Sequence, residues 1–135
     1  ETMKRSTIED TRFPTCPVRN ILARLCDKWA LLVLYLLARS QTGKLRFTEL
    51  KQAMPDITQK MLATTLRTLE EDGYISRTLF AEVPLRVEYA LTTRAETLSP
   101  ILEELLLWAV ENMDAVMQDR KTAHASKTEI KQHKA

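Results

Sequence analysis

The segment from Ile57 to Gly73 most strongly constrains how this chain can fold. Thr58 has the residue type of a helix N-cap, and Gly73 stands where a left-handed C-terminal cap ends a helix. Between them, apolar residues recur at the three- and four-residue spacing of a buried stripe: Met61, Leu62, Leu66 and Leu69. We therefore predict an amphipathic helix from Thr58 to Asp72.

A shorter helix is predicted immediately before it. Thr48 can cap this helix, and Leu50, Ala53 and Met54 are expected to face inward. Pro55 and Asp56 end it, so the two helices are separated by a tight turn.

After Gly73 the hydrophobic period changes from helical spacing to two. Residues 75–80 and 86–91 alternate and are rich in Thr, Val, Tyr and Phe, with about five residues between them. This pattern predicts a β-hairpin.

The first part of the chain predicts an irregular arm over residues 1–15 and then two helices. Pro17 fits the first turn of the first helix, and Asp27 is a plausible N-cap for the second. The second helix is expected to stop in a turn that contains Gly43, and residues 45–47 to form a short strand.

A long last helix is predicted to open with the capping box Thr93-Arg94-Ala95-Glu96. Pro100 is expected to bend this helix or to mark a second start. After Asp119 the chain is polar, so residues 119–135 are predicted to be a disordered tail, leaving one domain over residues 16–118.

This order of elements predicts an α+β, mainly α, fold. Three core helices followed by a two-stranded wing form a winged helix-turn-helix, with long N- and C-terminal helices for dimerisation. In such a unit the second helix enters the DNA major groove.

Side chains able to contact DNA are expected on the solvent face of the helix from Thr58 and around the hairpin. The proposed reading face consists of Thr58, Gln59, Lys60, Thr64 and Arg67. The proposed backbone contacts are Arg77 and Arg86, flanking the wing tip, with Arg46 and Lys51 near the same edge. The alternative is an ordinary solvated helix face, and the formal charge of +2 does not decide between the two.

Six separated motifs together resemble the HxlR-type winged-helix transcriptional regulators, a bacterial and archaeal group related to MarR. They are Cys16-Pro17-Val18, Asp27-Lys28-Trp29, Arg46-Phe47-Thr48-Glu49-Leu50, Ile57-Thr58 with Met61-Leu62, residues 66–73 and residues 84–92. The resemblance covers roughly residues 16–110 and implies a homodimer on an inverted-repeat operator. The chain departs from the usual family pattern at Cys26-Asp27 and at Ala95, outside the proposed reading face.

Apolar residues on the two terminal helices also favour a dimer. Val18, Ile21, Leu22 and Leu25 on one helix, and Leu105 to Trp108 on the other, exceed what a small three-helix core can bury. The alternative is a monomer with a thicker core.

Cys16 is a candidate redox sensor. A thiol at a helix N-terminus near Arg19 can have a lowered pKa, and the resemblance implies sensing of oxidants or electrophiles in this Cys-Pro context. The alternative is a small buried side chain at the dimer seam. Cys26 lies ten residues further along, about 15 Å away in a helix, so an intrachain disulfide is not expected.

Other classes of function find little support in the sequence. The longest apolar run, residues 29–38, is too short to span a bilayer, and residues 1–12 do not form a signal peptide, so we expect a cytoplasmic protein without a membrane partner. His124 and His133 lie in the polar tail, and no cofactor, metal site or enzymatic activity is predicted. The rival hypothesis is a winged helix that binds another protein rather than DNA.

Overall fold

The structure is a computed structural model that describes residues 17–134, with side chains described as far as residue 128. Its elements are α2 (Pro17–Leu25), α3 (Lys28–Arg39), β1 (Lys44–Arg46), α4 (Phe47–Ala53), α5 (Gln59–Glu71), β2 (Ile75–Phe80), β3 (Arg86–Leu91) and α6 (Thr93–Lys134). The chain divides into two compact units, residues 1–100 and 101–135. The predicted arm over residues 1–15 lies outside the described residues.

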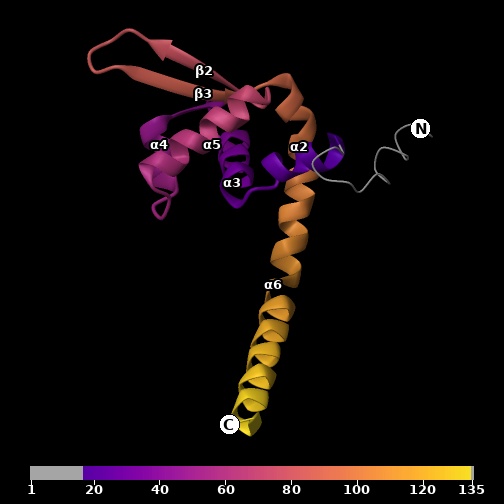
Figure 1. The fold of residues 1–135 in the computed structure, drawn as a ribbon. Coiled ribbons are helices and arrows are strands. Elements are labelled where there is room, and N and C mark those ends of the chain that lie inside the picture. The colour runs from indigo at the N-terminus through magenta and orange to yellow at the C-terminus, as the bar shows by residue number, and fades with distance from the viewer. Residues whose placement is uncertain (1–16, 135) are drawn as a thin grey trace, which may run out of the picture. The chain divides into compact units, whose positions relative to one another are not determined.

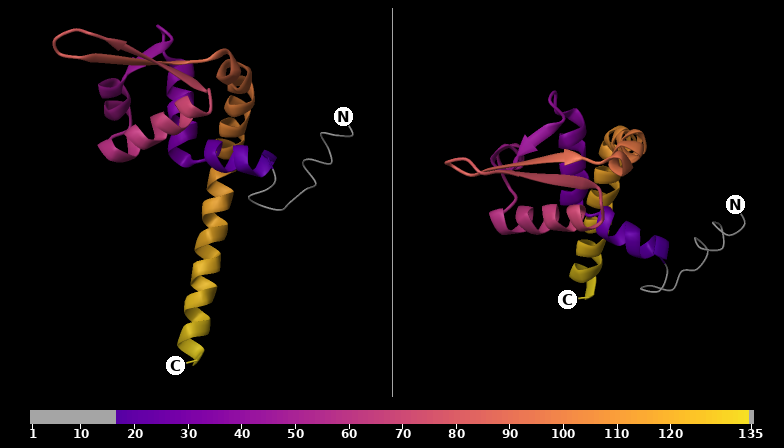
Figure 2. Two further views of the ribbon diagram at one scale, coloured as in Figure 1. Left: turned by 45° about the horizontal axis from the view of Figure 1, so that its top comes forward. Right: turned by 90° about the horizontal axis from the view of Figure 1, so that it is seen from above.

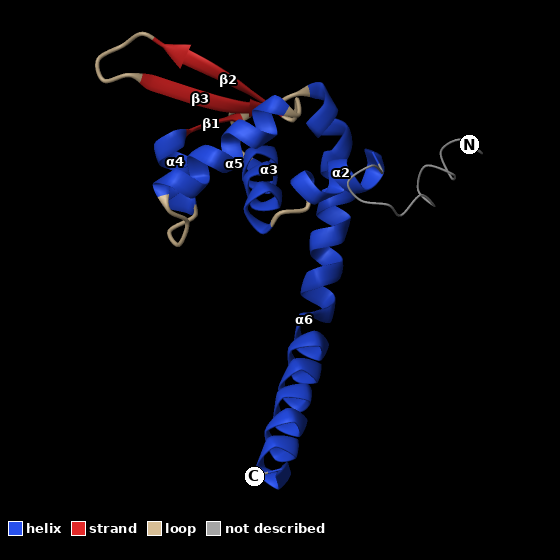
Figure 3. Ribbon diagram, in the orientation of Figure 1, coloured by secondary structure: helices blue, strands red, loops and turns tan. Residues whose placement is uncertain are grey.

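In the first unit, helices α3, α4 and α5 pack with a small antiparallel sheet (Figures 1 and 3). The strand order is β1-β3-β2, so the hairpin predicted from the sequence gains a third strand, with Leu45 opposite Tyr89. The winged helix-turn-helix architecture is therefore confirmed, with a three-stranded sheet in place of a two-stranded one. The core is formed by fully buried apolar side chains: Val33, Leu37, Leu50, Met54, Leu62, Leu66, Leu69 and Ile75.

The stripe predicted for α5 is wrong at one position. Met61 is 46% exposed, whereas Thr65 is buried. Burial of Thr65 is tolerated because its hydroxyl donates to the carbonyl of Met61 at 2.9 Å, so no polar group is left without a partner.

Some of the predicted helix N-caps are present in the structure and others are not. Asp27 accepts from the amides of Trp29 and Ala30, as predicted. Thr48 is not a cap, because the N-cap of α4 lies two residues earlier, at Arg46, whose amide donates to the side chain of Glu49 at 2.9 Å. Ala53, expected to face inward, is exposed.

The cap of α6 also lies earlier than predicted, by one residue. The hydroxyl of Thr92, not that of Thr93, accepts from the amide of Ala95 at 3.4 Å. The same hydroxyl donates to the carbonyl of Gly73 at 2.6 Å. This tertiary contact explains why Thr92, and not the adjacent Thr93, is the N-cap.

The two glycines end helices in different ways. Gly73 has a φ of 77°, as the predicted left-handed cap requires. Its amide donates to the carbonyl of Glu70, and the amide of Tyr74 donates to that of Leu69, which is the Schellman arrangement. Gly43 also has a positive φ, of 74°, but it lies in the turn after α3, where Ser40 is the C-cap.

The C-terminal helix differs from the sequence expectation, whereas the described part of the N-terminal helix, α2, spans nine residues. Helix α6 continues through Pro100 and through residues 119–134, which were predicted to be disordered. Residues 119–134 contain neither Gly nor Pro and include four Lys and two Ala, which are good helix formers.

Candidate nucleic-acid interface

Helices α4 and α5 form the predicted helix-turn-helix pair. Between them, Pro55 and Asp56 are exposed, while Met54 and Ile57 are buried and joined by an amide-to-carbonyl hydrogen bond of 3.2 Å. Apolar anchors on both sides of the turn fix how α5 leaves the core. The solvent face of α5 is therefore held by a rigid scaffold.

Thr58 caps the N-terminus of α5, as predicted. Its backbone is extended, and its hydroxyl oxygen accepts from the amide of Met61 at 3.1 Å. The first amides of a helix have no intrahelical acceptor, and the helix dipole adds partial positive charge there. This end of α5 is suited to a phosphate oxygen.

The predicted reading face is exposed along the first turns of α5. Gln59, Lys60, Thr64 and Arg67 are all exposed. The hydroxyl of Thr64 donates to the carbonyl of Lys60 at 3.0 Å, so its oxygen can still accept a hydrogen bond. Met61 joins this face, although its apolar type had placed it in the predicted core.

The hairpin places its two arginines differently from the prediction. Arg86 pairs with Phe80 at the end of the strands next to the loop, so it does flank the tip. Arg77 pairs with Tyr89, further from the tip, so the prediction that both arginines flank the tip is wrong for Arg77. Both strands have the predicted bounds.

Arg86 is engaged within the wing. Its Nη2 lies 3.1 Å from Oε1 of Glu82, and its guanidinium lies 4.0 Å from the centroid of the Phe80 ring. Its Nε is buried without a hydrogen-bond partner among the described residues. The ring and the carboxylate together hold the guanidinium beside the loop.

Arg46 lies close to the wing. A recess is lined by Arg46, Phe47 and Thr48 at the start of α4 and by residues 82 and 84–87 of the wing. Lys51, on α4, is half-buried. In Figures 1 and 2, α4, the N-terminal end of α5 and the hairpin tip lie at the same end of the first unit.

Residues predicted for dimerisation are largely uncovered in the single chain. On α2, Ile21 and Leu22 are 53% and 47% exposed, Val18 is half-buried, and Leu25 is buried. In the second unit, Leu105 and Trp108 are 50% and 59% exposed. Cys16 lies outside the described residues, and Cys26 is a free, exposed thiol.

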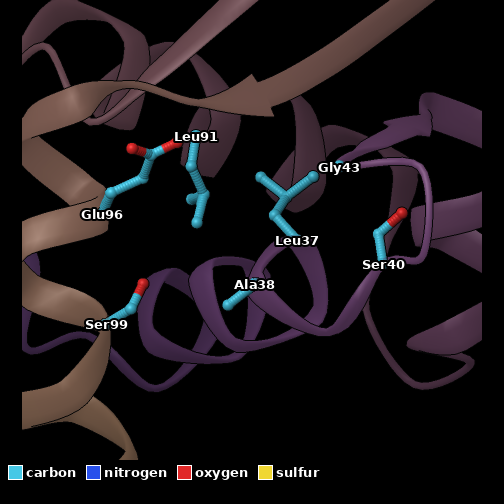
Figure 4. Close-up of a pocket in the computed structure, with 7 residues that line it drawn as sticks. All are labelled: Leu37, Ala38, Ser40, Gly43, Leu91, Glu96 and Ser99. Carbon is cyan, nitrogen blue, oxygen red and sulfur yellow. The ribbon is translucent and has the colours of Figure 1, made fainter.

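A separate pocket lies at the end of α3 (Figure 4). It is lined by Leu37, Ala38, Ser40, Gly43, Leu91, Glu96 and Ser99. The hydroxyls of Ser40 and Ser99 donate to backbone carbonyls, at Lys44 and Ala95. None of the predicted site residues lines this pocket.

Within residues 17–134, no helix is both long enough and apolar enough to cross a lipid bilayer.

The paired helices, the exposed polar face of α5 and the adjacent hairpin define a winged helix-turn-helix protein. The HxlR-like helix-turn-helix family matches residues 24–117, and the chain belongs to this family. It is therefore a transcriptional regulator of the helix-turn-helix type and not an enzyme.

Relatives and solved structures agree with this assignment. An HTH-type transcriptional regulator of Halalkalibacterium halodurans is 42% identical over 111 residues, which cover 82% of this chain and 92% of that protein. The structure of the transcriptional regulator YtfH from Salmonella typhimurium has a TM-score of 0.71 at 34% identity, covering 79% of this chain and 93% of that chain. The redox regulator HypR in its reduced form has a TM-score of 0.67 at 37% identity, covering 76% of this chain and 98% of that chain.

Proposed function

We propose that the protein is a homodimer that binds an inverted-repeat operator through the N-terminal half of α5. The observation that carries this proposal is the exposed face of Gln59, Lys60, Thr64 and Arg67, held at the end of the unit that also bears the hairpin tip. A regulator of this kind acts where the genome lies, so we place it in the cytoplasm.

The chemistry of this face suits a major groove. An amide such as that of Gln59 can pair with an adenine edge, and Lys60 and Arg67 can donate to guanine or to phosphate. Thr58 and the first amides of α5 are suited to a phosphate. Met61 adds an apolar contact of the kind that thymine methyl groups accept.

The wing and the start of α4 are proposed to contact the DNA backbone. Arg46 and Arg86 line one recess, Lys51 lies on the neighbouring helix, and Arg77 is exposed further along the hairpin. These contacts are sequence-independent, so they position the protein and make binding sensitive to salt.

Dimerisation is supported by the uncovered apolar side chains on α2 and α6. Ile21, Leu22, Leu105 and Trp108 are each about half exposed in the single chain, and apolar faces of this kind mark association surfaces. Two-fold symmetry places two copies of α5 about one DNA turn apart, which matches an inverted repeat.

Cys16 is proposed as the site of a redox or electrophile response. It immediately precedes Pro17, the first residue of α2, and the similar protein HypR is a redox regulator. A quinone is a suitable effector, since a thiolate adds to a ring carbon to form a C–S bond. Proton uptake then converts the ring to a hydroquinone thioether.

A DNA-binding titration tests the proposed reading face. A duplex selected by the protein from a random pool is titrated by fluorescence anisotropy against wild type and the double variant Gln59→Ala with Lys60→Ala. Because a good base contact is worth about 1–3 kcal/mol, we expect operator affinity to fall at least about tenfold. The matched control, Gln118→Ala with Lys121→Ala, removes the same residue types from α6 and should leave affinity unchanged.

Unchanged affinity in the Gln59 and Lys60 variant would contradict the assigned reading face. If wild type selects no duplex and shows no salt-dependent DNA binding at low ionic strength, the rival function is favoured. That function is a winged helix that binds another protein.

A further inference from the structure

The C-terminal end of α5 is held by side chains from two other parts of the first unit. From α2, Arg24 donates through Nε to Oδ2 of Asp72 at 2.8 Å and through Nη2 to Oε2 of Glu71 at 3.1 Å. From the start of α6, Nη1 of Arg94 donates to the carbonyl of Asp72 at 2.7 Å. The contacts of Arg24 join segments nearly fifty residues apart in the sequence.

The acidic residues that Arg24 binds do not favour α5 as an isolated helix. Glu70, Glu71 and Asp72 stand at its C-terminal end, where the helix dipole already places partial negative charge. A guanidinium from another helix offsets this repulsion. The hydrogen bond to Asp72, followed by the one to Glu71, raises the pKa of Arg24.

The contact of Arg24 is better suited to orienting α5 than to stabilising the folded protein. The side chains of Arg24, Glu71 and Asp72 are 42%, 57% and 31% exposed, and exposed ion pairs contribute little to the free energy of unfolding. A planar guanidinium that binds two neighbouring carboxylates fixes direction as well as distance. Since α5 has 13 residues, a change at this end acts over about 18 Å of helix to its N-terminus.

We infer that Arg24 is a positioning residue that couples α2 to α5 and so sets how α5 is presented to DNA. This inference rests on the proposed function, because it requires α5 to be the reading helix. Helix α2 also carries Ile21 and Leu22 of the proposed dimer face and begins next to Cys16. Through Arg24, a change in α2 that is caused by dimer assembly or by chemistry at Cys16 would alter the orientation of the reading face.

The test compares specific with non-specific DNA binding. The variants are Arg24→Gln, Asp72→Asn and the two combined, and the control Arg39→Gln removes a positive charge from α3. Each is titrated against the selected duplex and against a scrambled duplex of equal length, and each melting temperature is recorded.

We expect Arg24→Gln and Asp72→Asn each to weaken specific binding by about fivefold or more, the lower range of a coupling between sites. Scrambled-duplex binding should change little, because most of the proposed phosphate contacts come from the wing and the start of α4 and not from α5. The Asp72 variant is decisive: loss of a negative charge alone would strengthen DNA binding, whereas loss of positioning weakens it. The combined variant should lose no more than either single one, because both remove one interaction.

A DNA-free measurement tests the same link. The nine described residues of α2 include one buried side chain, Leu25, so few other contacts hold this segment in place. Amide hydrogen exchange in α2 should therefore be faster in Arg24→Gln and in Asp72→Asn, with α3 unchanged and melting temperatures close to wild type.

Wild-type specific affinity in both single variants overturns the inference and leaves the proposed function intact. Unchanged exchange in α2 of both variants also overturns it. If affinity for the specific and the scrambled duplex falls equally, Arg24 acts only through its charge, and the positioning role is overturned. Failure of wild type itself to select DNA overturns the proposed function, and with it the presentation of α5 to DNA.

Discussion

In the wing, Nη2 of Arg86 lies 3.1 Å from Oε1 of Glu82, so the guanidinium nearest the hairpin tip is already paired with a carboxylate of the same wing. The Phe80 ring holds the same guanidinium at 4.0 Å from its centroid. A DNA phosphate that binds Arg86 must therefore compete with Glu82 for it. The local ion pair limits what this arginine contributes to non-specific affinity.

Glu82→Gln should strengthen DNA binding. The substitution releases Arg86 and removes a negative charge near the phosphates, and we expect up to about fivefold higher affinity at low salt, in the range of an exposed ion pair. Anisotropy titrations across a salt series measure this gain, which should shrink as salt rises. Glu103→Gln, on α6, is the charge-matched control, and an equal gain in both variants would contradict a specific role for Glu82.

Gly73→Ala should destabilise the fold more than Gly43→Ala. Both glycines have a positive φ, so a side chain at either site costs about 1–2 kcal/mol of backbone strain. A Cβ at Gly73 would also collide with the guanidinium of Arg94 and break its bond to the carbonyl of Asp72, whereas a Cβ at Gly43 meets nothing within 4 Å. Urea unfolding should show about 1 kcal/mol more loss for Gly73→Ala; equal losses would argue against the Arg94 contact.

Ile21→Glu should convert the proposed dimer to monomers. A glutamate at an apolar interface is left as an unpaired charge, so the dissociation constant of the dimer should rise by about a hundredfold or more. Sedimentation velocity measures the shift. Asn20→Glu adds the same charge at the preceding exposed position, outside the predicted apolar stripe, and should remain dimeric. A dimeric Ile21→Glu protein would exclude this face of α2 from the interface.

Treatment with p-benzoquinone should change operator affinity in wild type and not in Cys16→Ser. The reason is that the thiolate at Cys16 is the proposed nucleophile. Cys26→Ser is the matched control and should respond as wild type does, although Cys26 is itself free and exposed. Mass spectrometry of the adducts and anisotropy on the same samples connect the modified site to the affinity. A full response in Cys16→Ser removes the sensor role.

Local signals in the sequence predicted much of the fold. The N-caps Asp27 and Thr58, the C-terminal cap at Gly73 and both strands of the hairpin stand where the residues predicted them. Each of these features depends on side chains within a few positions of one another. The exposed polar face of α5 was predictable for the same reason, since it follows from helical spacing.

Features that depend on distant partners were not predictable from local signals. Burial of Thr65 with exposure of Met61 reflects which side of α5 meets the core, and both residue types are compatible with the helix. Thr92 rather than Thr93 caps α6 because Thr92 reaches the carbonyl of Gly73. Pairing of β1 with β3 joins residues more than forty positions apart.

The sequence by itself therefore determined that the chain forms a helix-turn-helix followed by a wing, because caps, turns and periodicity act over a few residues. Only the tertiary structure decided which side chains of these elements contact one another. It placed Arg86 against Glu82 and Phe80, and it brought Arg24 of α2 to the acidic end of α5. Such contacts are set by how whole elements pack, so the acidic turn, which in the sequence only closes a helix, becomes an attachment point for α2.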